Sequence, residues 1–453
     1  MPQRKQGVAG RVSYSYDGRY YIEGNFGYNG SENFAKGHRF GFFPSIAVGY
    51  NISNEKFWQP IKPVISNLKI RGSWGLVGND ATNAGRFAYM EDLVLGGSDS
   101  YTTGIRQDTY YSGPSWNRYF NPDLTWEVGE KINLGLDLQL FNDFNLTFDI
   151  FREKRRDIFM TRENSIPEIV GTGETKITSN NGEMENKGLD LAIDYNKQIT
   201  KDFFLSFKST LTFARNKVLK RDEPPYFEYP GLSDVGHPLG TYWGYVADGL
   251  FPDQETIDNS PRQDLGYTPQ PGDIKYVNQP NAKGEYDNVI NSNDRVAIGH
   301  PYDPELVYGF GPSMKWKNWD FYFFFQGVAR TSFMMYGMHP FGTTSIKNML
   351  QFVADDHWSV DNPNPNAAYP RLTKDSNGNN DQYSTYWLRN AAFLKLKNAE
   401  IGYTYKGMRF YLSGVNLLTF SPFKHWDPEM GGGNGLYYPT QRVFNIGFQM
   451  TIQ

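Results

Sequence analysis

The stretch KINLGLDLQLFNDFNLTFDIF, residues 131–151, decides the fold. From Lys131 to Leu140 and again from Phe144 to Ile150, every second residue is Ile, Leu or Phe, and the residues between them are polar or Gly. This period of two is typical of a β-strand with one apolar and one polar face. Each arm has about ten residues, whereas strands of ordinary globular proteins average roughly five or six. The stretch predicts a long hairpin with one uniformly apolar face.

The composition limits the class of protein. The 453 residues have a mean hydropathy of -0.60, and no run approaches the roughly 20 apolar residues of a membrane helix, which excludes a helical membrane protein. Aromatic residues reach 16%, which together with many half-apolar strands favours an all-β protein and a membrane barrel in particular. A net charge of -4 gives no electrostatic signature of nucleic-acid binding. The absence of Cys excludes disulfides and thiolate metal sites.

The same alternation recurs along the chain and predicts roughly thirteen strands. No amphipathic helical pattern of comparable length competes with it. The predicted strands span residues 8–16, 20–28, 40–50, 68–77, 130–140, 143–153, 186–196, 203–213, 306–316, 319–329, 392–404, 408–416 and 442–452.

The connections between these strands alternate in length. Short turns join residues 16 to 20, 140 to 143, 196 to 203, 316 to 319 and 404 to 408, and the segment 51–67 is of intermediate length. Long segments rich in Gly, Pro, Asn and Asp span 78–129, 154–185, 214–305, 330–391 and 417–441. Outer-membrane barrels have this rhythm because their periplasmic turns are short and their extracellular loops long. We therefore predict an all-β, antiparallel transmembrane β-barrel in the cell outer membrane, with the long segments outside and the C-terminus in the periplasm.

Two other classes of protein compete with this interpretation. A soluble all-β carbohydrate-binding module or β-propeller glycosidase would bury Leu136 and Phe148 against a second sheet. It would also be expected to have shorter strands and regular turns. A passive porin would share the barrel but lack a plug. Strands of about ten residues favour a barrel, because roughly 9–11 tilted residues cross the hydrocarbon layer.

Several motifs resemble those of the SusC/RagA family of TonB-dependent outer-membrane transporters, typical of Bacteroidota. They occur in the family's order over essentially the whole chain. The motifs are RVSYSYDGRYYIEGNFGYNGSENFAKGHRFGFFPSIAVGYNIS, ISNLKIRGSWGLVGND, NPDLTWEVGEKINLGLDLQLFND, NNGEMENKGLDLAIDYN, GHPLGTYWGYVADGLF, PGDIKY, NDRVAIGHPYDPELVYGFG, YWLRNAAFLKLKNAEIGYTY, YLSGVNLLTFSPFKHWDPEM and RVFNIGFQMTI.

This resemblance implies a 22-stranded barrel, an N-terminal plug and a TonB box. It also implies a SusD-like surface lipoprotein as partner and import of glycan oligosaccharides or peptides, driven by the TonB complex. About thirteen strands would form the C-terminal part of such a barrel, beginning near its tenth strand, so the plug is expected to be absent from this chain. The first residues, MPQRKQGVAGRVSYSYDGRYY, contain no apolar signal-peptide segment. We therefore expect contact with TonB to depend on a preceding N-terminal part, and the apolar faces to contact outer-membrane lipids.

Two departures from the family pattern affect these expectations. After PGDIKY the chain reads VNQPNAKGEYDNVINSNDR, which lacks the regular Asp spacing of a calcium loop, so neither a metal nor another cofactor is predicted. The chain ends in Gln453, where the family usually has an aromatic residue that the assembly machinery reads. The last strand still alternates correctly.

No group of residues predicts catalysis, and the chain is not expected to be an enzyme. The six histidines are scattered: His38, His237, His300, His339, His357 and His425. The sequence DDHW at 355–358 is more often a packed loop motif than an acid–base pair. MGGGNG at 430–435 does not lie between a strand and a helix, so it is not a phosphate loop. REKRRD at 152–157 is interpreted as a solvated rim or a contact with lipopolysaccharide phosphates.

Aromatic residues in the long segments are the candidate ligand-binding residues. Aromatic rings offer flat apolar faces, and Tyr and Trp add a polar group, a combination that suits the C–H faces of sugars. For each residue the competing interpretation is a place in the aromatic girdle of a barrel. The candidates are Trp116, Tyr119, Tyr242, Trp243, Trp358, Tyr386, Trp387 and Trp426.

Overall fold

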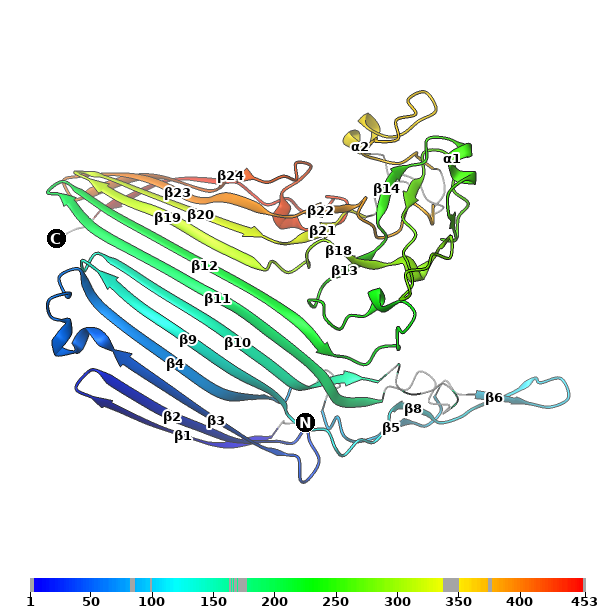
Figure 1. The fold of residues 1–453 in the computed structure, drawn as a ribbon, viewed down its shortest axis with the longest axis horizontal. Helices are drawn as coiled ribbons and strands as arrows, with labels where there is room; N and C mark the ends of the chain where they lie inside the picture. The colour runs from blue at the N-terminus through cyan, green and yellow to red at the C-terminus, as the bar shows by residue number, and fades with distance from the viewer. Residues whose placement is uncertain are drawn as a thin grey trace. The chain divides into compact units, whose positions relative to one another are not determined.

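The computed structural model describes residues 4–81, 86–97, 100–162, 164, 166, 169, 177–336, 350–373 and 377–450. Its main element is a sheet of 13 long strands in the order β1-β2-β3-β4-β9-β10-β11-β12-β19-β20-β23-β24-β25 (Figure 1). The bounds are β1 Lys5–Tyr16, β2 Tyr20–Ser31, β3 Phe40–Asn51, β4 Ile65–Asn79, β9 Glu127–Leu140, β10 Phe144–Thr161, β11 Thr178–Thr200, β12 Phe203–Lys220, β19 Leu306–Trp316, β20 Trp319–Ala329, β23 Phe393–Tyr405, β24 Met408–Phe420 and β25 Val443–Met450.

The predicted antiparallel fold is confirmed. Each long strand pairs with its neighbours along the chain, and no plug region lies among the described residues. The short turns have the local chemistry that a hairpin needs. Between β23 and β24, Lys406 and Gly407 have φ angles of 47° and 79°, as a two-residue type I′ hairpin requires.

Several strands are longer than the sequence pattern predicted, and β10, β11 and β12 exceed it most. The lengths of β10, β11 and β12 are 18, 23 and 18 residues. Most of their extra residues lie at the ends that lead into the long connections. The apolar alternation ends at Arg152 and Lys187, where charged residues replace Ile and Leu, although the hydrogen-bonded ladder continues.

The chain divides into two compact units, described here one at a time. Unit 1 comprises Met1–Leu189, Arg215–Pro225 and Asp234–Gly236, and unit 2 comprises Asp190–Ala214, Tyr226–Ser233 and His237–Gln453.

In unit 1 the strand register separates an apolar face from a polar face. Leu136 pairs with Ile70 of β4 and with Phe148 of β10, and directly paired residues project from the same face. Large side chains on this apolar face are exposed instead of forming a core. They are Val8, Val12, Tyr14, Tyr16, Tyr20, Ile22, Phe26, Tyr28, Phe40, Phe42, Ile46, Val48, Ile70, Trp74, Ile132, Leu134 and Ile150.

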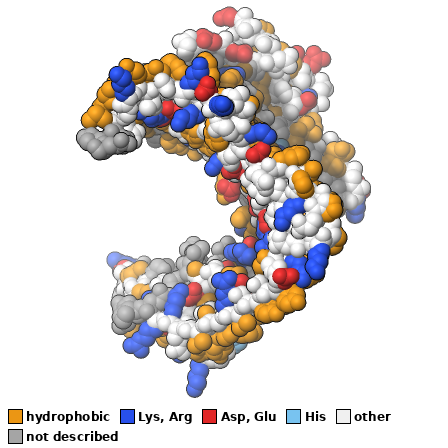
Figure 2. All heavy atoms as spheres, turned by 90° about the vertical axis from the view of Figure 1, so that its left-hand side faces the viewer, with side chains coloured by type: hydrophobic (Ala, Val, Ile, Leu, Met, Phe, Trp, Pro, Cys, Tyr) orange, Lys and Arg blue, Asp and Glu red, His pale blue; other side chains and the backbone are white. Residues whose placement is uncertain are grey.

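Unit 2 shows the same division. Phe321 pairs with Ile401 of β23, which pairs with Leu412 of β24. The exposed apolar side chains on this face are Trp316, Trp319, Ile401, Tyr405, Phe410, Leu412, Leu418, Phe420, Phe444, Ile446, Phe448 and Met450. Figure 2 shows apolar side chains gathered along one side of the strands and charged side chains gathered along the other.

The soluble alternative required a second sheet over the apolar face. Leu136 and Phe148 are only half-buried, and neither belongs to a core cluster of the described residues. Among these residues no helix is long and apolar enough to cross a membrane.

Buried cores lie in the long connections. In unit 2 the described parts of residues 237–305, 330–392 and 421–442 pack around one core and are called the loop body below. Its core is Tyr245, Leu250, Ile274, Tyr276, Ile290, Ile298, Phe333, Met334, Met335, Val353, Trp358, Ala367, Tyr369, Trp387, Ala391 and Phe423. A smaller core in unit 1 consists of Phe34, Ala88, Leu124 and Trp126.

The remaining elements are short and lie between the long strands. In unit 1 they are β5 Asp92–Val94, β6 Ser100–Thr103, β7 Thr109–Ser112 and β8 Ser115–Arg118, with 3-10 helices Ile52–Asn54 and Lys56–Trp58. In unit 2 they are β13 Tyr242–Gly244, β14 Ala247–Leu250, β15 Arg262–Gln263, β16 Ile274–Tyr276, β17 Val289–Ile290, β18 Val296–Ile298, β21 Ser332–Met334, β22 Leu388–Asn390, α1 Gln254–Asp258 and α2 Gln351–Asp355, with 3-10 helices Pro230–Leu232, Ser292–Asp294 and Pro428–Met430.

Candidate functional site

On the polar face of unit 1, one arginine spans three strands. Arg71 of β4 donates to Asp137 of β9, with Nε 3.1 Å from Oδ2, and to Asp149 of β10, with Nη2 2.6 Å from Oδ2. It reaches Asp149 over Gly135 of β9, where a Cβ would lie 2.5 Å from the Arg71 Cζ and 2.7 Å from Oδ1 of Asp149. Gly135 therefore makes room for the guanidinium. We call this arrangement the Arg71 clip.

The polar face of unit 2 repeats the arrangement with other residues. Arg409 of β24 donates to Asp320 of β20, with Nε 3.0 Å from Oδ1, and to Glu400 of β23, with Nη2 2.5 Å from Oε1. The middle strand again provides a glycine. A Cβ on Gly402 would lie 2.5 Å from Oδ2 of Asp320 and 2.7 Å from Nη2 of Arg409. This is the Arg409 clip, and both clips place charge on the face opposite the exposed apolar side chains.

A buried lysine fastens the last long connection to the sheet. Lys395 of β23 is fully buried, and its Nζ lies 2.6 Å from Oδ2 of Asp427 and 2.5 Å from Oε2 of Glu429. Burial by itself would raise the pKa of both carboxyl groups. The hydrogen bonds from Lys395, with Thr440 also donating to Asp427 and Lys397 to Glu429, offset burial and lower the pKa of each.

A buried polar network joins two segments of the loop body. Asp273 is fully buried. It accepts hydrogen bonds from Nε of Arg371 at 2.7 Å, from Nδ2 of Asn377 at 2.9 Å and from Nδ2 of Asn380 at 2.9 Å. The backbone N–H of Gln270 donates to its other oxygen at 2.8 Å. These bonds use the carboxylate to hold loops together, so the network is structural.

The predicted aromatic residues of the loop body are mostly packed. Trp358 and Trp387 belong to its core, and Tyr242, Tyr386 and Trp426 pack against that core. Burial raises the pKa of the Tyr386 hydroxyl, which donates to the carbonyl oxygen of Ala367. These five rings help to shape the loop body, and direct contact with a ligand stays a prediction for them.

Three predicted aromatic residues lie differently. Trp116 and Tyr119 stack in unit 1, with ring centroids 5.5 Å apart and an interplanar angle of 19°. Trp116 keeps 37% of its surface exposed. In unit 2, Trp243 meets the ring of His237 edge-on at 5.1 Å. The stacked pair presents the kind of flat surface on which a sugar ring stacks.

A second aromatic pair escaped the sequence prediction. Tyr101 of β6 and Tyr111 of β7 stack with centroids 5.3 Å apart, and they are 59% and 47% exposed. The turn of this small hairpin contains Gly104, whose φ is 91°. The signal in the sequence was a pair of tyrosines on either side of a Gly-containing turn. That pattern is weak because the two strands have only four residues each.

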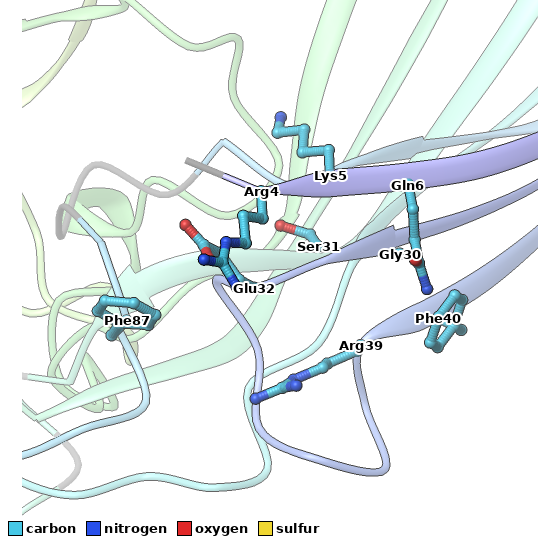
Figure 3. Close-up of a pocket in the computed structure, with 9 residues that line it drawn as sticks. All are labelled: Arg4, Lys5, Gln6, Gly30, Ser31, Glu32, Arg39, Phe40 and Phe87. Carbon is cyan, nitrogen blue, oxygen red and sulfur yellow. The ribbon is translucent and has the colours of Figure 1, made fainter. Parts of the chain in front are cut away.

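A polar pocket of about 400 Å³ lies in unit 1 at the start of β1, the end of β2 and the start of β3. Figure 3 shows the guanidinium of Arg4 beside Glu32, with Phe87 across the opening. The backbone N–H of Arg4, followed by Arg86 at 2.6 Å, lowers the pKa of Glu32 in spite of its burial. The pocket is lined by Arg4, Lys5, Gln6, Gly30, Ser31, Glu32, Arg39, Phe40 and Phe87. Such a lining suits a polar solute.

In the part of the chain that the structure describes, the histidines and acidic residues form no group of three or more that could hold a metal ion. His339 lies outside that part. In DDHW, Trp358 lies in the core and Nδ1 of His357 lies 2.8 Å from the carbonyl oxygen of Ala354. His425 stacks on Phe352 at 4.1 Å, and burial followed by the charge of Arg389 lowers its pKa. These residues have packing roles.

Comparisons with known proteins agree with this arrangement of a two-faced sheet and folded connections. The sequence family described as "TonB dependent receptor-like, beta-barrel" matches residues 3–417. The chain is 29% identical to the TonB-dependent receptor SusC of Bacteroides thetaiotaomicron over 97% of its own length and 43% of that protein. It is 27% identical to TonB-dependent receptor P3 of Formosa agariphila, over 98% and 45% of the two chains.

A solved structure of the RagAB peptide importer in its open-open state shares the fold. It superposes with a TM-score of 0.77 at 21% identity, covering 99% of this chain and 47% of that chain. The chain thus spans about half the length of the curated relatives that it matches. It belongs to the TonB-dependent receptor β-barrel family and to its SusC/RagA group, whose members are outer-membrane transporters and not enzymes.

Proposed function

We propose that this chain forms the C-terminal part of the barrel of an outer-membrane importer of large nutrients, glycan oligosaccharides in the first place. The exposed apolar faces of the two units carry this proposal. Seventeen large apolar side chains in unit 1 alone are exposed on one face, from Val8 to Ile150. Side chains of this kind are stable in lipid, whereas in water they would drive aggregation.

The polar face lines the path of the solute. In hydrocarbon a charged side chain costs several kcal/mol, so charged side chains belong on the water-filled side of a barrel. Both arginine clips lie on that side, where they brace neighbouring strands. The charged groups of the two clips therefore lie away from the lipid.

The orientation follows from the connections. The long segments 78–129, 154–185, 214–305, 330–391 and 417–441 are extracellular loops, and the short turns and the C-terminus are periplasmic. The loop body then lies on the extracellular side and contacts a SusD-like surface lipoprotein. Energy for transport comes from the TonB complex through an N-terminal part of the whole protein.

The stacked aromatic pairs support glycans as the substrate class. Trp116 with Tyr119 and Tyr101 with Tyr111 provide two exposed ring surfaces in the connection 78–129. A sugar presents C–H groups that can pack against the flat apolar faces of such rings. Trp116 and Tyr119 are therefore the first ligand residues to test.

The experiment uses the intact transporter that contains this chain. Cells carrying it are grown on single polysaccharides and on peptide mixtures, and uptake of labelled oligosaccharide is compared with uptake in a strain without TonB. We expect TonB-dependent uptake of one glycan class. In Trp116→Ala we expect binding of that glycan to fall several-fold, and Trp58→Ala, outside the long connections, is the control. TonB-independent uptake would point to a passive porin, and growth on peptides alone would replace glycans by peptides.

A further inference from the structure

The apolar face of unit 1 changes to a charged surface on β10 and β11. The register of β10 against β9 places Arg152 opposite Ile132 and Lys154 opposite Glu130, so these cations share the face of Leu136 and Phe148. Ion pairs place two acidic residues of β11 on the same face, Glu185 at 2.6 Å from Arg152 and Glu183 at 3.0 Å from Lys154. We call this surface the rim ladder. It consists of Arg152, Lys154, Arg156, Glu183, Glu185 and Lys187.

The sequence run REKRR is divided between the two faces. Arg152, Lys154 and Arg156 project from the apolar face, whereas Glu153 and Arg155 pair with each other on the polar face at 2.9 Å. Trp74 marks the boundary, because its Nε1 donates to Oε1 of Glu130 at 2.9 Å. A Trp whose ring lies against the apolar stretch and whose N–H points toward the charged residues beyond it is typical of the level where hydrocarbon ends.

Strand β10, which carries part of the rim ladder, continues well beyond this boundary. After Ile150, β10 extends to Thr161. Those roughly ten residues at about 3.3 Å each, tilted by roughly 40°, rise about 25 Å above the hydrocarbon. Lipid headgroups fill the first several ångströms of that height. Arg152, Lys154 and Lys187 thus lie at headgroup depth, and the strands rise past them.

Within the rim ladder the cations lie outermost. Arg152 and Lys187 are 50% and 59% exposed, whereas Glu185, which pairs with both, is 12% exposed. Arg156 is 57% exposed, and its carboxylate contact Asp157 is 3.7 Å away. The carboxylates position the cations and leave guanidinium and ammonium groups facing outward. Charge-assisted donors in such a row match phosphate oxygens.

We infer that the rim ladder binds the phosphate groups of outer-leaflet glycolipids, as a lipid-specific contact on the wall of the transporter. The inference rests on the proposed function, because only a barrel in an outer membrane brings this face against such lipids. A bisphosphorylated glycolipid offers two dianionic groups at the depth of Arg152 and Lys187. A phospholipid offers one monoanionic phosphate, so the inference commits to the glycolipid.

The test uses the intact transporter that contains this chain, extracted from the outer membrane, with bound lipid A measured by mass spectrometry. The variant combines Arg152→Gln, Lys154→Gln, Arg156→Gln and Lys187→Gln, and its matched control is Arg155→Gln from the same run on the opposite face. Each cation near an anionic surface contributes about fivefold in binding, and the pairing with Glu183 and Glu185 reduces this, so we expect a loss of about five- to tenfold in the variant. The control should keep its lipid A. Equal lipid A in both proteins overturns the inference.

A second measurement uses the unaltered transporter, so that it does not depend on how well the variant assembles. Nanodiscs contain bisphosphorylated lipid A, monophosphoryl lipid A or phosphatidylglycerol, and the retention of each lipid by the transporter through purification is compared. Retention that falls with each phosphate removed supports the inference, and equal retention of all three lipids overturns it. Absence of the protein from the outer-membrane fraction would instead contradict the proposed function itself.

Discussion

In the sheet of unit 2, Leu412 and Phe410 are 53% and 52% exposed, whereas in the loop body Ile274 and Met335 are fully buried. The polar groups show the reverse. Arg409 keeps a quarter of its side chain exposed on the sheet, while Asp273 is sealed inside the loop body. Within one chain, the sheet therefore exposes apolar side chains as a protein in lipid does, whereas the loop body buries them as a water-soluble domain does. Substitutions with similar chemistry should have opposite consequences in the two regions.

The largest effect is expected in the loop body. Asp273→Ala removes the acceptor for Arg371, Asn377 and Asn380 and leaves a half-buried guanidinium without its carboxylate. We expect the loop body to lose about 3–5 kcal/mol of stability, measured by thermal unfolding of the intact transporter in detergent. Asp248→Ala is the control, because its ion pair with Lys275 is exposed and should contribute less than about 1 kcal/mol. Equal losses of stability for Asp273→Ala and Asp248→Ala would contradict the interpretation of the loop body as a packed domain with a buried polar network.

The sheet should respond most to charge on its apolar face. Leu136→Arg places a cation near the middle of the exposed apolar stretch of β9, and we expect a loss of about 2–4 kcal/mol in lipid vesicles, measured by denaturant unfolding. Asn133→Arg lies on the polar face of the same strand and should change stability little. In a water-soluble sheet the half-exposed Leu136 would tolerate Arg at small cost. A harmless Leu136→Arg would therefore refute the lipid-facing assignment.

The junction between sheet and loop body should depend on pH. The pKa values of Asp427 and Glu429 are lowered in the folded protein, so their pairing with Lys395 stabilises the fold fully above their unfolded pKa of about 4. That contribution is lost as the pH falls further through the lowered values. We expect proteolysis of segment 421–441 to accelerate between about pH 4 and pH 2, measured with an acid-stable protease. Lys395→Met should make the segment labile already at neutral pH, at a cost of about 2 kcal/mol after allowance for partial exposure.

The smallest effect is expected at a clip. Gly402→Val introduces atoms where Arg409 meets Asp320, so the ion pair must open. Because the pair is partly exposed, we expect a loss of about 1 kcal/mol in vesicles. Asp320→Asn combined with Gly402→Val should add little further loss if the clip is already open. Full additivity in this double-mutant cycle would show that the glycine acts independently of the clip.

The sequence predicted the sheet well because each strand carries its own signal. A face turned to lipid requires an apolar residue at every second position, and this requirement is local. The signal ended at Arg152 and Lys187, so the extensions of β10 and β11 were missed although their backbone pairing continues. Strand bounds beyond the apolar stretch depend on hydrogen bonds to neighbours, which side-chain pattern alone does not reveal.

The candidate ligand residues were predictable only as a residue type. Trp387 and Trp116 look alike in the sequence, as aromatic residues in polar segments. The first lies in a core built from segments more than a hundred residues apart, and the second is stacked and exposed. The Asp273 network likewise joins residues separated by 98 to 107 positions. Long-range packing of this kind has no local periodicity.

The clips have a consequence for how the strands find their register during assembly. A slip of β9 by one residue would bring Leu134 or Leu136 beneath the guanidinium of Arg71, and the reversal of faces would already forbid it. A slip by two residues keeps the faces correct, so the apolar pattern cannot reject it. It would, however, put the side chain of Asn133 or Asp137 where Gly135 now leaves room for Arg71, so the guanidinium would have to shift away from Asp149. The glycine of each clip thus disfavours a two-residue slip, which the alternation of apolar and polar residues cannot reject.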